Sequence, residues 1–185
     1  FYLDLLDQSD FVTPNPVSGT VTILDDDLIE IGVADSPNIF EGNLASFTVS
    51  IDQAHPTEPV TIDYTTTNGT AIAPNDYAAD SGMLTFPAAT TVLSQTISIS
   101  TIDDTIDELL EEFSLTLSSP SSNATITDGT GLANITDNDN PPTISIGDAM
   151  VDEDSGTVDL PITLSQESGQ ALQIDYQTTN GSAIG

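Results

Sequence analysis

The sequence predicts an all-β protein built from tandem immunoglobulin-like β-sandwich modules of about seven strands each. Three observations indicate this class. Apolar and polar residues alternate with a period of two along many short segments. Turn-forming stretches, such as residues 67–70 and 80–82, separate these segments. Long stretches of the chain also recur after a fixed interval.

The alternation marks seven strands in one complete unit, each with one face directed toward a core. We expect these strands at residues 29–33, 44–51, 60–66, 83–86, 92–100, 113–118 and 132–136. The expected core faces consist of alternating apolar residues: Phe47, Val49, Ile51, Ile97, Ile99, Phe113, Leu115 and Leu117. Seven short strands in roughly 110 residues fit a sandwich of this kind.

The repeat interval is 112 residues. Residues 113–117 repeat residues 1–5, residues 131–139 repeat 19–27, and residues 174–184 repeat 62–72. We therefore predict three parts: residues 1–27 as the C-terminal part of a preceding repeat, 28–140 as a complete domain, and 141–185 as the N-terminal part of a following repeat. The Asn-Pro-Pro stretch at residues 140–142 cannot continue a central strand. The chain is expected to be a piece of a larger protein.

Charge is the most informative feature of the composition. The 185 residues include 30 Asp and Glu but no Lys or Arg, which gives a formal net charge of −30. Two carboxylates about 4 Å apart repel by about 4 kcal/mol at an effective dielectric constant near 20, so clustered acids need a cation, a proton or water between them. This charge argues against nucleic acid as a partner. We also expect no direct membrane insertion, since no apolar run approaches the roughly 18 residues of a transmembrane helix.

The residues needed for common enzymatic chemistry are missing. The chain has no Cys and a single His, so a nucleophilic triad or a zinc site lacks its parts. We expect that His55, in a hairpin loop beside Pro56, is solvated. The sequence therefore predicts a protein that is not an enzyme.

The sequons that begin at Asn68, Asn123 and Asn134, with a fourth at residue 180, matter only in a eukaryotic secretory pathway.

Most acids of the complete unit fall at strand ends and in loops, where a sandwich can bring them together at one end. They are Glu41, Asp76, the run at residues 103–108, Glu111 and the pair Asp137 and Asp139. Calcium takes 6 to 8 oxygen ligands from carboxylates, carbonyls and water, and loops supply them at flexible spacing. The number of acids exceeds the needs of one ion, so we expect more than one Ca2+ per complete domain.

Three motifs resemble those of the Calx-beta family, which occurs in the regulatory loop of sodium/calcium exchangers, in integrin β4 and in large surface proteins. They are NGTAIAPNDY at residues 68–77, IDDTIDELLEEF at 102–113 and ITDND at 135–139. Their joint order spans the unit from its third strand to its end. The flanking partial repeats extend the resemblance across nearly the whole chain.

The resemblance implies a set of calcium ligands. The corresponding positions are Glu41, Asp76, Asp103, Asp104, the carbonyl of Ile106, Glu108, Glu111, Asp137, Asn138 and Asp139. Two positions depart from the family pattern, because Thr105 replaces a third consecutive Asp and Asn138 replaces the middle Asp of the terminal run. An Asn can coordinate through its side-chain oxygen but removes one negative charge.

The sequence leaves more than one function open. The leading expectation is a calcium-binding adhesive repeat that stiffens and spaces a large extracellular or cell-surface protein, with neighbouring repeats and other cell-surface proteins as partners. The first alternative is a calcium-sensing regulatory domain of a membrane protein such as an exchanger. The second is a structural spacer that binds no metal, with its acids reflecting a solvated surface or a salty habitat.

Overall fold

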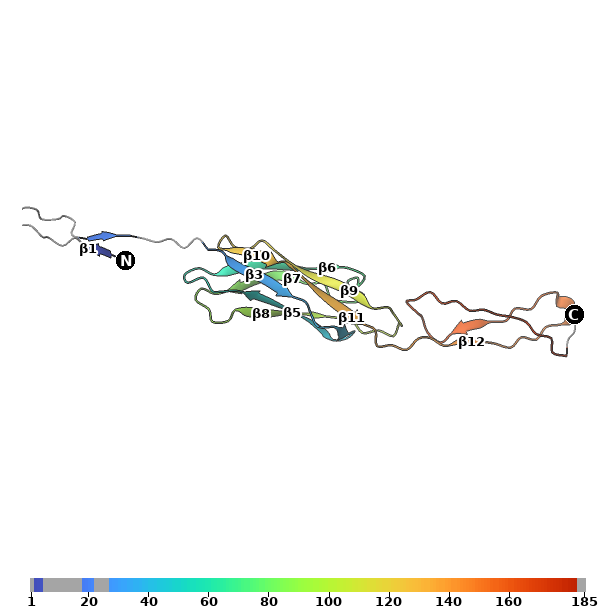
Figure 1. Cartoon of the computed structure of the whole chain (residues 1–185). Coiled ribbons are helices and arrows are strands. Elements are labelled where there is room, and N and C mark those ends of the chain that lie inside the picture. Colours follow the sequence, from blue (N-terminus) through green and yellow to red (C-terminus); the bar gives the residue numbers. More distant parts are fainter. Residues whose placement is uncertain (1, 5–17, 22–26, 183–185) are drawn as a thin grey trace, which may run out of the picture.

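The computed structural model describes residues 2–4, 18–21 and 27–182, and nearly all of its regular structure is β (Figure 1). Two sheets pack face to face over residues 29–136. The predicted all-β sandwich is therefore confirmed. In the described part of the chain no helix has the length and apolar character needed to cross a membrane.

The first sheet has four strands in the order β10-β3-β5-β8. Their bounds are β3 (Ile29–Ala34), β5 (Leu44–Ile51), β8 (Ser94–Ser100) and β10 (Ala124–Asp128). The second sheet has five strands in the order β4-β11-β9-β6-β7. Their bounds are β4 (Ile39–Phe40), β6 (Val60–Asn68), β7 (Ser81–Phe86), β9 (Glu111–Ser118) and β11 (Thr130–Thr136).

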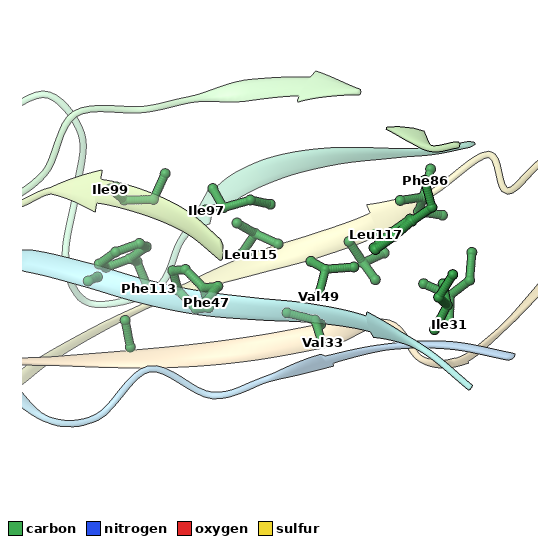
Figure 2. Close-up of a cluster of buried hydrophobic side chains, with 14 of the residues drawn as sticks. Ile31, Val33, Phe47, Val49, Phe86, Ile97, Ile99, Phe113, Leu115 and Leu117 are labelled. Carbon is green, nitrogen blue, oxygen red and sulfur yellow. The ribbon is translucent and has the colours of Figure 1, made fainter. Parts of the chain in front are cut away.

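Alternation of buried and exposed residues places the core between the sheets. All the core residues expected from the sequence are buried, and Figure 2 shows the side chains of β5, β8 and β9 meeting in one layer. Phe47 and Phe113 meet edge to face, with ring centroids 5.9 Å apart. Each fully buried large apolar side chain contributes about 1.5–3 kcal/mol relative to an exposed one.

Two strands of the sandwich lie outside the seven expected ones. The two-residue β4 pairs in parallel with the end of β11, a match too short to produce a period of two. Strand β10 pairs in parallel with β3, and only Ala124 of its five residues is buried. Only Gly129 separates β10 from β11, although these two strands belong to different sheets. Strand β8 begins at Ser94 instead of residue 92, and Val92 is exposed in the preceding loop.

The N-terminal flank repeats a strand pair of the sandwich. Strands β1 (Tyr2–Asp4) and β2 (Ser18–Thr20) pair with Leu3 opposite Gly19. In the sandwich, β9 and β11 pair with Leu115 opposite Gly131. Both residues are shifted by the repeat interval of 112, so the two pairs have the same register.

The C-terminal flank repeats a different pair. Strands β12 (Ile144–Ile146) and β13 (Ile162–Leu164) pair with Ile146 opposite Ile162, in the way that β3 and β5 pair with Val33 opposite Val49. A short 3-10 turn (Glu153–Ser155) lies between β12 and β13. The flanks thus contain strand pairs of the kind expected for partial repeats, and the proposed boundaries at residues 27 and 140 stay a prediction.

Candidate metal centre

The acidic loops meet at one end of the sandwich because antiparallel neighbours start and finish there. Strand β8 finishes where β5 begins, with Ser100 opposite Leu44. Strand β6 finishes where β9 begins, with Asn68 opposite Phe113. Strand β11 finishes beside the start of β9, with Ile135 opposite Glu111. The turn before β5, the connections after β6 and β8, and the segment after β11 therefore share this end.

Carboxylates gather there in two groups. Asp76, Glu108 and Glu111 are half-buried and can each place one carboxylate oxygen within 4.8 Å of the others. Glu41 and Asp139, together with the exposed Asp104, form a second group within the same distance. We call them the Glu111 group and the Glu41 group. A cavity of about 10 Å³, close to the space that one water needs, is lined by members of both groups.

The turn that presents Glu41 depends on a glycine. Gly42 has a φ of +75°, a left-handed conformation that favours glycine. A Cβ at this position would also lie 2.9 Å from the Cβ of Asp103. The turn can therefore bring Glu41, which is 7% exposed, close to the connection after β8 only if residue 42 has no side chain.

Asp76 is fixed by its own backbone surroundings. Its Oδ2 accepts a hydrogen bond of 2.6 Å from the N–H of Ile72. Its carbonyl accepts the N–H of Ile102 at 2.9 Å, which ties it to the connection after β8. The next residue, Tyr77, is 1% exposed and stacks on Phe113 with ring centroids 4.1 Å apart. The Asp76 carboxylate is thus held in place by core packing directly beneath it.

Hydrogen-bond donors within the site come from amides, since the chain has no Lys or Arg. The N–H of Asn138 donates to Glu41 Oε1 at 3.1 Å, and its side-chain Nδ2 donates to Asp103 Oδ1 at 3.3 Å. The N–H of Ile106 donates to Asp104 Oδ1 at 2.7 Å. These donors hold the loops but add no positive charge.

Burial and like charge disfavour ionisation at this end. Burial is the main cause that raises the pKa of Glu41 to about 7; the hydrogen bond from the Asn138 N–H lowers this pKa, and a hydrogen bond and charge from Asp137 raise it further. Burial and the neighbouring Asp76 likewise raise the pKa of Glu111 to about 7. The pKa of Glu108 is also raised, first by burial and then by the charge of Asp76. A cation between these groups would favour their ionised forms and so lower these pKa values.

One carboxylate oxygen lacks a partner. Asp139 Oδ2 is buried and is the only such side-chain atom without a hydrogen bond among the described residues. A covered acceptor without a partner is unfavourable unless a donor or a cation approaches it. Its position beside Glu41 and Asp104 makes it suitable for binding a cation. The residues present therefore fit a metal ion such as Ca2+, which prefers oxygen ligands.

Comparison with known families agrees with the fold and the motifs. The family model described as Calx-beta domain matches residues 25–141 and, a second time, residues 137–185. The chain belongs to the Calx-beta domain family. Calx-beta domains are regulatory calcium-binding modules rather than catalytic ones. No curated protein was found that matches the sequence.

Solved structures with the same fold include three of Calx proteins. The apo-form Calx CBD1 domain is 24% identical, with a TM-score of 0.56 over 61% of this chain and 100% of that domain. CBD12 from CALX1.2 is 23% identical (TM-score 0.54, 64% of this chain, 49% of that one). The calcium binding domain CBD12 of CALX1.1 is 24% identical (TM-score 0.51, 61% of this chain, 47% of that one). At this identity the likeness shows the fold.

Most of the predicted ligand positions of this Calx-beta unit lie together. Six of them form the two carboxylate groups, and Asp137 also lines the cavity. Asp103 and Asn138 are hydrogen-bonded to each other beside the Glu41 group. Ile106 is tied to Asp104 through its N–H, so its carbonyl as a ligand stays a prediction, as do the ligand roles of the whole set.

One residue outside the predicted ligand set lies at this Calx-beta site, and one acid of the predicted run lies beside it. Asn75 lines the cavity, and its place directly before Asp76 was the only available signal. Asp107 belongs to the acidic run but faces the following segment, where Gln170 Nε2 donates to its Oδ2 at 3.2 Å. The spacing of the acidic run does not predict that Glu108 joins a carboxylate group while Asp107 does not, because the loop conformation decides which carboxylate turns inward.

Proposed function

We propose that the complete Calx-beta unit binds more than one calcium ion at the acidic end of its sandwich. The observation that carries the proposal is the convergence of two carboxylate groups, each within 4.8 Å, in a chain without Lys or Arg. Like charges this close repel by several kcal/mol unless a cation lies between them. The unpartnered Asp139 Oδ2 and the calcium-binding character named for the related CBD12 structure support the same ion.

Thermal unfolding with and without calcium tests this proposal. Ions that bind only the folded state add RT ln(1 + [L]/Kd) to its stability, about 2.7 kcal/mol at a hundredfold excess over Kd. The melting temperature of the chelator-treated chain should therefore rise when calcium is added. Magnesium at the same concentration should have a much smaller effect, since it demands octahedral geometry and retains its water. Equal melting temperatures in chelator and calcium would contradict the proposal.

For the biological role, we propose calcium-dependent stiffening and spacing of consecutive units in an extracellular or cell-surface protein, acting as a binding module rather than an enzyme. Support comes from the position of the Glu41 group, since Asp139 directly precedes the Asn140-Pro-Pro142 connection. Without a cation, repulsion at this end should loosen the connection. Adhesion to other cell-surface proteins would then be the use of a stiffened array.

Small-angle scattering on a chain extended to two whole units tests the stiffening role. Calcium at constant ionic strength should make the maximum dimension larger and less variable. If dimension and spread are the same in chelator, the ions stabilise each sandwich and the stiffening role is wrong.

A calcium sensor in a membrane protein is the second candidate. The observation that favours it is the fold similarity to the Calx CBD1 and CBD12 domains. A sensor requires a membrane transport domain in the same protein, whereas an array requires many further repeats. The sequence of the parent protein on either side of these residues separates the two candidates.

A further inference from the structure

The segment that follows β13 contacts the acidic connection of the complete unit. We call residues 166–170 the docking segment. Gln166 Nε2 donates to the carbonyl of Thr105 at 3.2 Å and to that of Asn140 at 2.8 Å. The N–H of Gly169 donates to the carbonyl of Asp107 at 3.1 Å. One side chain therefore joins the acidic connection to the residue that begins the link between the units.

The remaining contacts also use neutral donors on acidic partners. Gln170 Nε2 donates to Asp107 Oδ2 at 3.2 Å, and Asp107 and Ser168 form a parallel β-bridge. A Cβ at Gly169 would lie 2.9 Å from Glu108 Cγ, so the backbone of the segment approaches the Glu111 group closely. Amide N–H groups suit a surface of carboxylates and carbonyls because ionised carboxylates and carbonyls only accept hydrogen bonds.

The complete unit has its own copy of this segment. In the C-terminal flank, the N–H of Thr143 donates to Ser165 Oγ at 2.9 Å. In the complete unit, the N–H of Glu30 donates to Asp52 Oδ1 at 2.9 Å. Ser165 and Asp52 are therefore equivalent at an offset of 113 residues, one more than the interval of 112 that relates residues 174–184 to residues 62–72. The docking segment thus corresponds to the slightly longer stretch of residues 53–58 after β5. Its first residue is Gln in both copies, Gln53 and Gln166.

Residues 53–58 lie at the end of the sandwich where the chain enters β3. Asn123 Nδ2 donates to the carbonyl of Pro59, and its own carbonyl accepts the N–H of Ile29. Because the chain enters β3 here, a preceding unit would join the sandwich at this end. The β1–β2 pair, which repeats β9–β11 at the same register, indicates that such a unit precedes.

This loop also contains the single His of the chain. His55 Nδ1 accepts the N–H groups of Glu58 at 2.9 Å and Thr57 at 3.3 Å. An Nδ1 that accepts places the proton on Nε2, so the ring presents an N–H donor on its other side. Gln53, which is exposed, supplies two more N–H groups.

We propose that residues 53–58 are a docking surface for the acidic connection of a preceding Calx-beta unit, with Gln53 taking the role of Gln166 and His55 adding a donor. The partner is the stretch equivalent to residues 103–108. Each interface between consecutive units is then formed in the same way, because the loop after the second long strand of one unit contacts the acidic connection of the unit before it.

A loop exchange within the chain tests the proposal. Residues 166–168 (QES) are replaced by the sequence of residues 53–55 (QAH), so Gln53 and His55 of the proposed docking surface meet the acidic connection that is present. Gly169 is retained, because its N–H donates to Asp107 and a Cβ there would lie against Glu108. The chain has no cysteine, so spin labels on Thr96→Cys and Thr157→Cys, both at exposed positions, report the distance between sandwich and flank. Pulsed electron resonance gives the distribution of that distance for each variant.

The unchanged chain and the exchanged chain should give the same narrow distribution. Two disabled variants should both broaden it: Gln166→Ala with Gln170→Ala in the original loop, and Gln53→Ala with His55→Ala within the transplanted sequence. A broad distribution in the exchanged chain, or in the unchanged chain, overturns the proposal, as does a narrow one in the disabled exchange. All variants are measured at the same calcium concentration, so that the distance distributions test the docking surface and not the calcium binding of the site.

Discussion

The side-chain amide of Asn138 donates a hydrogen bond to Asp103 Oδ1 across 3.3 Å. The amide lies where the family pattern has a carboxylate, and its N–H donor partly compensates the charge of Asp103. Asn138→Asp removes this donor and adds a charge beside the Glu41 group. The calcium-free variant should therefore unfold at a lower temperature than the unchanged chain, and its calcium affinity should rise.

Melting temperature in chelator and a calcium titration measure the two effects. Asn134→Asp, on the same segment but hydrogen-bonded to Asn38, is a control outside the site. If Asn138→Asp leaves both the apo stability and the affinity unchanged, Asn138 has no part in setting the charge of the site.

Glu111→Gln and Glu112→Gln form a matched pair for the calcium site. The two residues are neighbours on β9, but Glu111 is half-buried in its carboxylate group and Glu112 is exposed. Glu111→Gln should remove most of the calcium-induced increase in melting temperature, because a carboxylate ligand is replaced by a neutral amide. Glu112→Gln should retain the full increase. Equal calcium shifts in the two variants would mean that the Glu111 group is not a ligand set.

Without calcium, stability should fall as pH rises between about 4.5 and about 7. The pKa of Glu41 and of Glu111 is about 7 in the folded chain, against the ordinary 4.5. Over this range the folded chain holds more protons than the unfolded one, so the free energy of unfolding decreases with pH. Above about 7 this contribution is fully lost.

Urea unfolding in chelator across this range measures the pH slope. The variant Glu41→Gln with Glu111→Gln should have a shallower slope, since neither amide titrates. Saturating calcium should also flatten it near pH 7 by stabilising the ionised carboxylates. A stability that rises from pH 5 to 7 in chelator would be inconsistent with the raised pKa values.

Phe113→Ala should destabilise the sandwich by about 3–5 kcal/mol, the usual range for a buried aromatic residue. Phe113 is 0% exposed, stacks on Tyr77 and meets Phe47 edge to face. Met83→Ala, at a site 62% exposed, should change stability by only about 0.5 kcal/mol. Urea unfolding compares the two. A similar loss in both would show that the Phe113 cluster is not the centre of the core.

The strands that alternate between core and solvent could be predicted from the sequence. Strand β5 has the expected bounds, and its apolar residues are buried as anticipated. Strand β10 could not be predicted. Its parallel partner β3 is distant in the sequence, and buried and exposed residues do not alternate along β10. The change of sheet at Gly129 could not be predicted either, because this single glycine separates strands that belong to different sheets.

The site could be predicted as a convergence of loops but not as two groups. Strand ends alone place Glu41, Asp76 and Asp139 at one end of a sandwich. Which carboxylates approach each other depends on turns such as the left-handed Gly42 and on which way each side chain leaves its loop. Asp107 illustrates this, because its side chain meets Gln170 of the following segment instead of a carboxylate group.

Isothermal titration of the chelator-stripped, folded chain with calcium tests the central claim most directly. Two carboxylate groups at one end of the sandwich predict heat of binding with more than one calcium ion per chain. Glu41→Gln together with Glu111→Gln, which changes one carboxylate in each group, should remove most of that binding. A flat titration of the unchanged, folded chain would contradict the claim that this Calx-beta unit binds calcium.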